Sequence, residues 1–454
     1  DLLEEVLYLV EYPTALCGHI DDRYLKLPKE AIITPMRDHQ RYFPMFDAAG
    51  KLMPKFITVR NGGAEHLDIV THGNERVLRA RLDDAVFFFE GDRKKTLEQH
   101  RASLHTVAFQ HGLGNMYDKT ERLRKLCAAL LQTTNLPADG AALDRAAALD
   151  RAAALCKADL VTGMVTEFTE LQGTMGREYA LLDGEGQAVA QAIGEQYMPR
   201  FAGDELPQSS EGRILAIADK LDNIMATFSR GMAPTGSQDP YALRRQALGI
   251  LNILSDGNVH FPLGKILEVT LKNLPVEVEN LAKLIDSVKD FFAQRAKNML
   301  LDKGLRYDVV DAVLAVPVGD DLANVFVQAD DLTAYLEMPQ AADSIQAFTR
   351  VENISKNHEV ENGVDAALFQ DPAEKALWEV LQKVEVTTVP LEAACAFKKV
   401  LEANDVLAAP VNAFFDAVMV MDKDEAVKNN RLALMQEVKR QVNQTADLSQ
   451  LIMK

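Results

Sequence analysis

Apolar residues recur every three or four positions through most of the chain, a spacing that predicts amphipathic helices. The clearest case is the stretch 213–254. Its first part has an apolar stripe formed by Ile214, Ile217, Leu221, Ile224, Met225 and Phe228. Asp219 and Asp222 fall between these residues, so we expect both on the polar side of the helix. After a loop rich in glycine and proline, Asp239 as N-cap and Pro240 as first helical residue predict a second helix.

The pattern differs near the start of the chain. Residues 41–46 and 52–60 are strand-like runs around a short glycine-containing loop, which predicts a β-hairpin. From about Gly73 the pattern becomes helical. Residues 143–155 repeat the unit LDRAAA, which has high helix propensity but fits a 3.6-residue period poorly. We therefore expect a helix on the surface there, not a repeat domain.

These patterns predict a mainly α, multidomain protein, and the length of 454 residues suits about three domains. The predicted domains are 1–112 (α+β), 113–256 (helical), 257–357 (a helical linker domain) and 358–454 (helical). In the last domain we expect breaks at Pro390 and Pro410. Its final helix turns Leu432, Met435, Val438 and Val442 inward. The chain opens in mid-pattern with Asp, so we expect it to be a fragment of a longer protein.

Composition narrows the functional classes. No apolar run approaches the roughly 18 residues that a membrane-spanning helix needs. The four cysteines are far apart and form no CxxC pair, which fits a reducing cytoplasm. The formal net charge of −18 gives poor long-range attraction to phosphates, so any nucleic-acid binding needs local basic patches.

Two arginine clusters are candidates for such patches. Arg76, Arg79 and Arg81 form the densest cluster, within the helical segment that follows Gly73. Arg244 and Arg245 lie close to the start of the second helix of 213–254, where free N–H groups attract anions. Solvated helix faces are the simpler alternative for both clusters.

Motifs of a self-contained active site are missing from the sequence. There is no GxSxG, no GxxxxGK[ST] and no GxGxxG after a predicted strand. The region 113–256 has the acidic character of a metal-dependent phosphohydrolase of the HD type, with Asp159, Glu167, Glu170, Asp219 and Asp222. Such sites use imidazoles beside carboxylates, yet no histidine lies between residues 112 and 259. Buried salt bridges and helix caps are the simpler explanation, and we predict no catalytic residue and no metal site.

Several long motifs resemble one family, the β subunit of bacterial heterotetrameric glycyl-tRNA synthetase, and occur in its order. They are ITPMRDHQRYFPMFDAAGKLMPKFITVRNG (33–62), GNERVLRARLDDAVFFFEGDRKK (73–95), KADLVTGMVTEFTELQGTMGREYA (157–180), PTGSQDPYALRRQALGILNIL (234–254) and FFDAVMVMDKDEAVKNNRLALMQEVK (414–439). The resemblance covers essentially the whole chain. It implies the central and C-terminal part of the subunit, without its N-terminal portion.

The resemblance implies a cytoplasmic α₂β₂ enzyme that joins glycine to its tRNA with ATP. In this family the α subunit carries the catalytic site, so ATP and Mg²⁺ are expected there and no cofactor on this chain. The implied partners of this chain are the α subunit and tRNA(Gly), with no membrane and no DNA. The alternatives are an HD-type phosphohydrolase and a scaffold that binds the α subunit only.

The resemblance also assigns domain types. Residues 113–256 resemble an HD domain through ADKLD at 218–222, without its histidines. Residues 358–454 resemble the helical anticodon-binding domain of arginyl-type synthetases, through MDKDEAVKNNRLALMQEV. Such domains can read unpaired bases by edge hydrogen bonds, with lysine and arginine on the backbone. The residues implied for tRNA here are Lys428, Asn430, Arg431 and Lys439. For Asn430 and Arg431, a role in helix packing is an equal alternative to contact with RNA. Lys428, Arg431 and Lys439 lie mostly off the apolar stripe of the helix.

Overall fold

The computed structural model of this chain shows two compact units, each with its own core. The structure describes residues 2–134, 142–236, 238–257, 259–316, 321–356, 358, 360 and 362–452. The first unit takes the described residues of 1–132, 136–226 and 269–277, and the second those of 133–135, 227–268 and 278–454. The predicted mainly α class is confirmed. The four predicted domain boundaries stay predictions. No described helix is long and apolar enough to cross a membrane.

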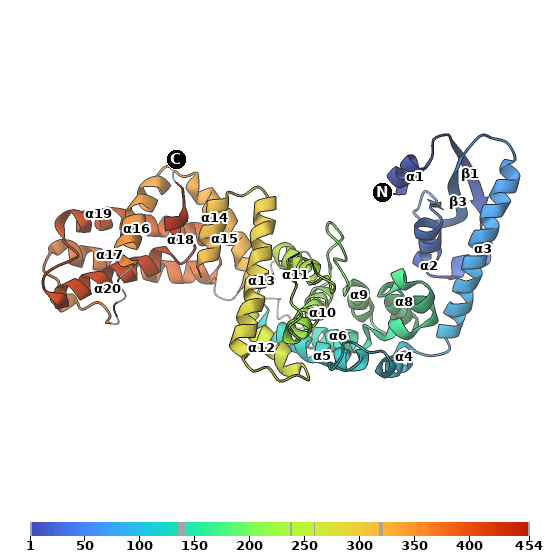
Figure 1. Ribbon diagram of the computed structural model, residues 1–454, viewed down its shortest axis with the longest axis horizontal. Coiled ribbons are helices and arrows are strands. Elements are labelled where there is room, and N and C mark those ends of the chain that lie inside the picture. Colours follow the sequence, from blue (N-terminus) through green and yellow to red (C-terminus); the bar gives the residue numbers. More distant parts are fainter. Residues whose placement is uncertain are drawn as a thin grey trace. The chain divides into compact units, whose positions relative to one another are not determined.

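A three-stranded antiparallel sheet lies near the start of the first unit (Figure 1). β3 (Leu52–Asn61) is its central strand and pairs with β2 (Phe43–Phe46), which confirms the predicted hairpin. β1 (Pro13–His19) pairs with the other side of β3 and was not predicted. Its proline and glycine hide the alternating pattern. Gly18 lies opposite Phe56, and a Cβ at Gly18 would overlap the Phe56 ring, so this strand position requires glycine.

A long helix, α3 (Leu67–Asp92), lies beside β1 (Figure 1). It begins six residues before Gly73, where the sequence predicted the start. Leu78 and Leu82 on α3 are fully buried. Two shorter helices complete this part: α1 (Leu2–Leu9) and α2 (Lys29–Thr34).

The remainder of the first unit is helical, as predicted. Its helices are α4 (Leu97–Arg101), α5 (Met116–Thr133), α6 (Ala142–Leu155), α7 (Gly163–Glu167), α8 (Thr174–Leu182), α9 (Gln187–Glu195) and α10 (Ser210–Ser229). All six residues of the predicted apolar stripe on α10 are buried. The predicted polar side is wrong for Asp219 and Asp222, which are 4% and 1% exposed. Periodicity separates polar from apolar residues, but it cannot detect that charged partners cover the polar side.

The repeated unit in α6 has two environments. Leu143 in the first copy is 85% exposed, whereas its equivalent Leu149 in the second copy is 1% exposed. Ala152 and Ala153, which follow Leu149, are fully buried. The prediction of a surface helix is therefore wrong for the second copy, because α9 packs against α6.

The chain from residue 243 onward is a series of helices. They are α11 (Leu243–Gly257), α12 (Leu263–Asn273), α13 (Leu281–Asp302), α14 (Tyr307–Ala315), α15 (Leu322–Leu336), α16 (Ala341–Ser355), α17 (Pro372–Ala393), α18 (Phe397–Asn404), α19 (Ala408–Ala417) and α20 (Glu425–Val442). α11 begins at Leu243 and not at the predicted Pro240, because a turn that ends at Ala242, with a φ of 52°, precedes it. Asp239 still caps the helix: its carboxylate accepts hydrogen bonds from the backbone N–H of Leu243 (2.8 Å) and of Arg244 (2.9 Å).

The C-terminal helices α16, α17, α19 and α20 pack together (Figure 1). The predicted inward stripe on α20 is confirmed, since all four of its residues are buried. The predicted breaks are shifted by two or three residues: α17 ends at Ala393, three residues after Pro390, and α19 begins at Ala408, two residues before Pro410. Pro410 is tolerated there because N–H groups in the first turn have no acceptor within the helix.

Candidate nucleic-acid interface

Five buried charged residues form what we call the central ion-pair network of the first unit. They are Lys119 and Arg122 of α5, Lys157, and Asp219 and Asp222 of α10. Lys119 Nζ lies 3.0 Å from Asp219 Oδ1 and 2.9 Å from Asp222 Oδ2. Lys157 Nζ lies 2.9 Å from the other oxygen of Asp219. Arg122 binds Asp222 through two nitrogens, at 2.8 and 3.1 Å. Each side chain is at most 6% exposed.

The network keeps its two carboxylates ionised. Burial raises the pKa of Asp219, but Lys119 and Lys157 outweigh it and hold this pKa well below the usual range. For Asp222, Lys119 and Arg122 likewise outweigh burial and lower the pKa. The carboxylates of the HD-like ADKLD segment are therefore neutralised by lysine and arginine. Within the described ranges, no three His, Cys, Asp or Glu side chains are grouped so that they could hold a metal ion.

The other acidic residues of this region are dispersed. Asp159 is fully buried, and its Oδ2 accepts hydrogen bonds from the backbone N–H of Gly173 (2.6 Å) and Gly176 (3.1 Å). Burial raises the pKa of Asp159 to about 6. Glu167 and Glu170 are exposed on the surface. The structure therefore does not bring the five carboxylates together as one site, and the phosphohydrolase alternative gains no support from their geometry.

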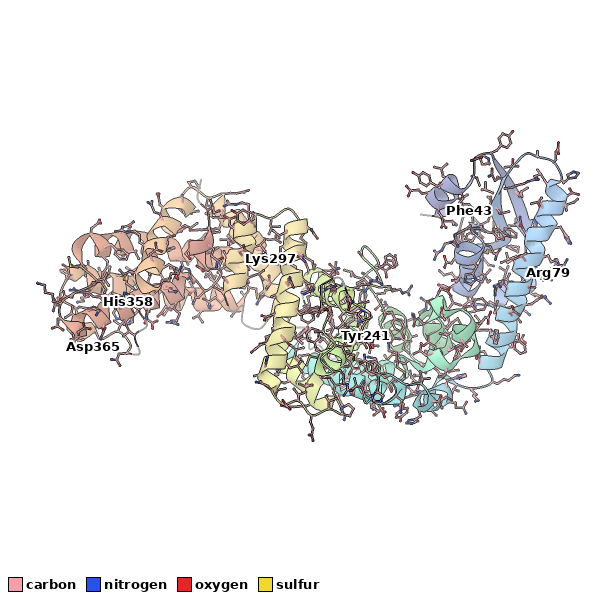
Figure 2. All side chains as sticks on the ribbon, in the orientation of Figure 1. Phe43, Arg79, Tyr241, Lys297, His358 and Asp365 are labelled. Atoms are coloured by element: carbon pink, nitrogen blue, oxygen red, sulfur yellow. The ribbon has the colours of Figure 1, made fainter. Side chains whose placement is uncertain are left out.

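The arginine cluster on α3 is exposed, as a binding surface requires. Arg76 and Arg79 are three residues apart and share one side of the helix, where Figure 2 labels Arg79. Neither makes an ion pair with any residue that the structure describes. Arg81 points elsewhere, and its Nη1 lies 3.4 Å from Glu167 Oε1. The accessible positive charge of this cluster therefore comes mainly from Arg76 and Arg79.

The arginines of α11 differ from each other. Arg245 is exposed, whereas Arg244 is half-buried and donates through Nη2 to the carbonyl oxygen of Gly236 at 2.6 Å. Arg244 lies beside Arg295 of α13, which the sequence reasoning missed. Arg295 belongs to no arginine cluster in the sequence, and its only signal was the four-residue spacing from Phe291, on whose ring it stacks.

On α20 the two lysines keep accessible surface. Lys428 Nζ lies 3.1 Å from Glu425, and its side chain is 23% exposed. Lys439 Nζ lies 2.8 Å from Glu352, and its side chain is 36% exposed. Lys428 can exchange its surface ion pair for a phosphate at small cost, whereas the partner of Lys439 is mostly buried, with Glu352 only 13% exposed.

Asn430 and Arg431 are buried inside the C-terminal helices, at 5% and 6% exposed. Asn430 donates to the carbonyl oxygen of Asp365 at 3.0 Å and accepts from its N–H at 2.7 Å. Arg431 binds Glu374 at 2.8 Å and Asp422 at 2.7 Å. The expectation that Arg431 lies off the buried stripe is wrong, because these two carboxylates draw it inward. Both side chains hold helices together, and their contact with RNA stays a prediction.

Glu374 is a buried residue that the sequence reasoning missed. It is fully buried and accepts from Arg431, and its other oxygen accepts from the backbone N–H of Asp371 at 2.7 Å. The pattern Asp371–Pro–Ala–Glu374 is a capping box at the start of α17. The sequence therefore carried a signal for the helix start, but none for the arginine partner.

Comparison with known proteins gives consistent matches along the chain. Residues 1–315 match the family described as glycyl-tRNA synthetase beta subunit, and residues 344–450 match the DALR anticodon binding domain. The glycine–tRNA ligase beta subunit of Clostridioides difficile is 47% identical over the whole of this chain, and those of Desulforamulus reducens and Moorella thermoacetica are each 45% identical. The chain spans 64–65% of the length of these relatives. The resemblance inferred from the motifs is confirmed: the chain belongs to the glycyl-tRNA synthetase beta subunit family.

Proposed function

We propose that this chain is a tRNA-binding part of the β subunit of glycine–tRNA ligase. The observation that carries the proposal is the family match over residues 1–315 followed by an anticodon binding domain match over residues 344–450. In this proposal the α subunit supplies the catalytic site with ATP and Mg²⁺, in a cytoplasmic α₂β₂ assembly. The chain itself supports ATP-dependent attachment of glycine by holding tRNA(Gly).

The exposed and half-buried basic residues on three helices are the proposed contacts to the RNA backbone. They are Arg76, Arg79 and Arg81 on α3, Arg244 and Arg245 on α11, and Lys428 and Lys439 on α20. Because the chain has a net charge of −18, these local patches have to supply the attraction that the whole chain lacks. Asn430 and Arg431 contribute by fixing α20, through their bonds to Asp365, Glu374 and Asp422.

The sharpest test compares two double variants of equal charge. Arg76→Gln with Arg79→Gln removes two cations that have no ion pair within the described chain. Arg124→Gln with Arg151→Gln removes two cations already bound to carboxylates, at 2.8 and 2.6 Å. We expect the first variant to bind tRNA(Gly) about tenfold more weakly, with a salt slope smaller by about 2. The control variant should stay within about twofold, since its arginines are already neutralised.

The measurement is tRNA(Gly) binding by fluorescence anisotropy at several salt concentrations, beside an unrelated RNA of equal length. Equal affinity of the unchanged chain for both RNAs would overturn the proposal. An equal loss of tRNA affinity in both double variants would overturn only the assignment of RNA contacts to α3. The scaffold alternative instead predicts that neither double variant changes tRNA affinity in the complex with the α subunit.

A further inference from the structure

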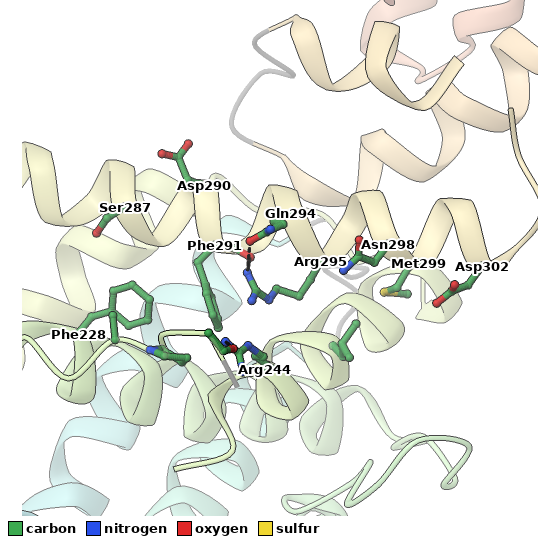
Figure 3. A pocket seen from close by; sticks show the side chains of 14 residues that line it. Phe228, Arg244, Ser287, Asp290, Phe291, Gln294, Arg295, Asn298, Met299 and Asp302 are labelled. Carbon is green, nitrogen blue, oxygen red and sulfur yellow. Dashed lines mark hydrogen bonds between the residues drawn. The ribbon is translucent and has the colours of Figure 1, made fainter. Parts of the chain in front are cut away.

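A pocket of about 820 Å³ lies within the second unit, between α11, α13 and the loop before α11 (Figure 3). Its size falls in the range of small-molecule sites, roughly 300–1,000 Å³. Phe228 and Phe291 form an apolar part of the wall, and Arg244 and Arg295 lie near each other in its middle (Figure 3). The family motif 234–254 supplies Pro234, Gly236, Arg244 and Leu248 to the wall, whereas Arg295 and the other wall residues of α13 lie in none of the quoted motifs.

The two arginines are held in place before any ligand binds. Arg295 stacks on Phe291, with Cζ 3.9 Å from the ring centroid, and donates to the carbonyl oxygen of Phe291 at 2.9 Å. The same Nη1 donates to Gln294 Oε1 at 3.1 Å. Arg244 is fixed by its 2.6 Å hydrogen bond to the Gly236 carbonyl. Little side-chain entropy is then lost when an anion binds, which favours affinity.

The positive charge of this pair is not neutralised by the residues that the structure describes, because neither arginine makes an ion pair with them. Burial and the nearby Arg244 lower the pKa of Arg295, while Asp239 acts in the opposite direction. Asp239 is already engaged by two backbone N–H groups of α11. The carboxylates of Asp290 and Asp302 also line the pocket, but Figure 3 shows them on either side of the pair along α13. An anion between Arg244 and Arg295 would relieve their repulsion.

The remaining polar groups of the wall suit a nucleotide better than a bare anion. Gln294 and Asn298 lie on the same stretch of α13 as Arg295, and each side-chain amide can donate and accept. Such groups pair with base edges, while arginines take the phosphate and aromatic rings take the apolar faces. A single inorganic anion would use only the arginines.

We propose that this pocket binds a nucleoside phosphate, with the phosphate between Arg244 and Arg295 and the base against Gln294 and Asn298. If the bound nucleotide is part of tRNA, this inference rests on the proposed function. A free mononucleotide has the same chemistry, and the two sources are separated by experiment.

The test uses the whole chain with Arg295→Gln and, separately, Arg244→Gln. Lys297→Gln is the matched control, since it removes one cation from the same helix and its Nζ lies 2.5 Å from Asp311, outside the pocket lining. The probes are tRNA(Gly), by anisotropy across a salt series, and AMP, by calorimetry. Thermal unfolding of each variant identifies any that fail to fold, and Arg244→Gln then replaces Arg295→Gln.

For a nucleotide within RNA, each pocket variant should bind tRNA(Gly) about tenfold more weakly, with a salt slope smaller by about 1. For a free mononucleotide, AMP binds the unchanged chain and is lost in both pocket variants, whereas tRNA affinity is retained. Either result supports the pocket. The proposal is overturned if neither pocket variant changes the affinity for tRNA(Gly) or for AMP by more than about twofold. It is also overturned if Lys297→Gln has the same effect as the pocket variants.

The two proposals fail separately. If tRNA(Gly) binding is normal in both pocket variants and AMP shows no binding that depends on Arg244 or Arg295, this site is removed and the proposed function stays intact. Binding of AMP that depends on Arg295, in a chain that does not bind tRNA(Gly), keeps the pocket and removes the proposed function.

Discussion

The central ion-pair network and the pocket on α13 both place basic side chains away from solvent. They differ in whether carboxylates neutralise the positive charge. In the network, every lysine and arginine lies within 3.0 Å of a carboxylate oxygen. In the pocket, Arg244 and Arg295 face each other, and the hydrogen-bond acceptors nearest to them are neutral oxygens of Gly236, Phe291 and Gln294.

This difference distinguishes basic side chains that stabilise the fold from basic side chains whose positive charge can still bind a ligand. A buried cation with a carboxylate partner is already neutralised, and an added anion would have to displace that partner. A fixed, half-buried cation whose acceptors are neutral keeps most of its potential for an incoming anion. By this criterion Arg431, with Glu374 and Asp422, belongs with the network. Arg76 and Arg79 are exposed and not half-buried, but they share with the pocket arginines the lack of a carboxylate partner among the described residues.

The largest effect is expected when the network loses an acidic member. Asp219→Ala leaves Lys157 buried without its carboxylate and removes one of the two from Lys119. We expect a loss of about 4 kcal/mol in the free energy of unfolding, measured by urea denaturation. The control is Asp150→Ala, which breaks the surface pair with Arg124 and should cost less than about 1 kcal/mol. Equal losses in the two variants would contradict a structural role for the network.

A smaller loss is expected in the C-terminal helices. Arg431→Ala leaves Glu374 buried without its guanidinium, so we expect about 3 kcal/mol lower stability. Lys428→Ala, three residues earlier on α20, breaks only a surface pair and should cost about 0.5 kcal/mol. tRNA(Gly) affinity, corrected for the folded fraction, should then fall more for Lys428→Ala. The reverse order of affinities would assign Arg431 to RNA contact.

The smallest effect is a change in pH dependence. Asp159 has its pKa raised to about 6 by burial, above the unfolded value of about 3.9. Between these values the folded state binds the extra proton, so this residue's contribution to stability is present below about pH 4 and is lost as pH rises to about 6. Asp159→Asn cannot titrate, and its side-chain oxygen can still accept from Gly173 and Gly176.

Thermal unfolding from pH 4 to 8 measures this effect. Relative to Asp159→Asn, the unchanged chain should lose about 2 kcal/mol between pH 4 and 6, with an upper limit of about 3 kcal/mol from the shift of two units. The exposed Asp144→Asn is the control and should leave the profile unchanged. Parallel profiles for all three chains would show that Asp159 does not titrate in this window.

Helices with a clear apolar stripe could be predicted from the sequence, because burial of that stripe is set by local spacing. The stripes of α10 and α20 are examples. The hairpin of β2 and β3 could also be predicted, from the two strand-like runs around a short loop. The fate of a polar residue could not be predicted, since it depends on partners far away in the chain. Asp219 is buried because Lys119 lies beside it, and these residues are 100 positions apart. Asn430 is buried because it binds Asp365.

Only part of the candidate site could be predicted, because partners far away in the chain again decide which residues come together. Arginines that occur in clusters, such as Arg76 and Arg79, are visible in the sequence, and their exposure follows from their places on α3. Arg295 is the only arginine of α13, and only the fold brings it to Arg244. The half-burial of Arg244 depends likewise on the loop that returns to Gly236.

The repeated unit of α6 sets how this helix can change length. Six residues make about one and two-thirds turns of an α-helix, so an insertion within the buried copy would rotate Leu149 away from Leu155 and the core. A unit added or removed before Leu143 would leave the angular position of the buried copy unchanged. Variation in the number of LDRAAA units among related chains should therefore accumulate on the exposed side, where it does not disturb the packing against α9.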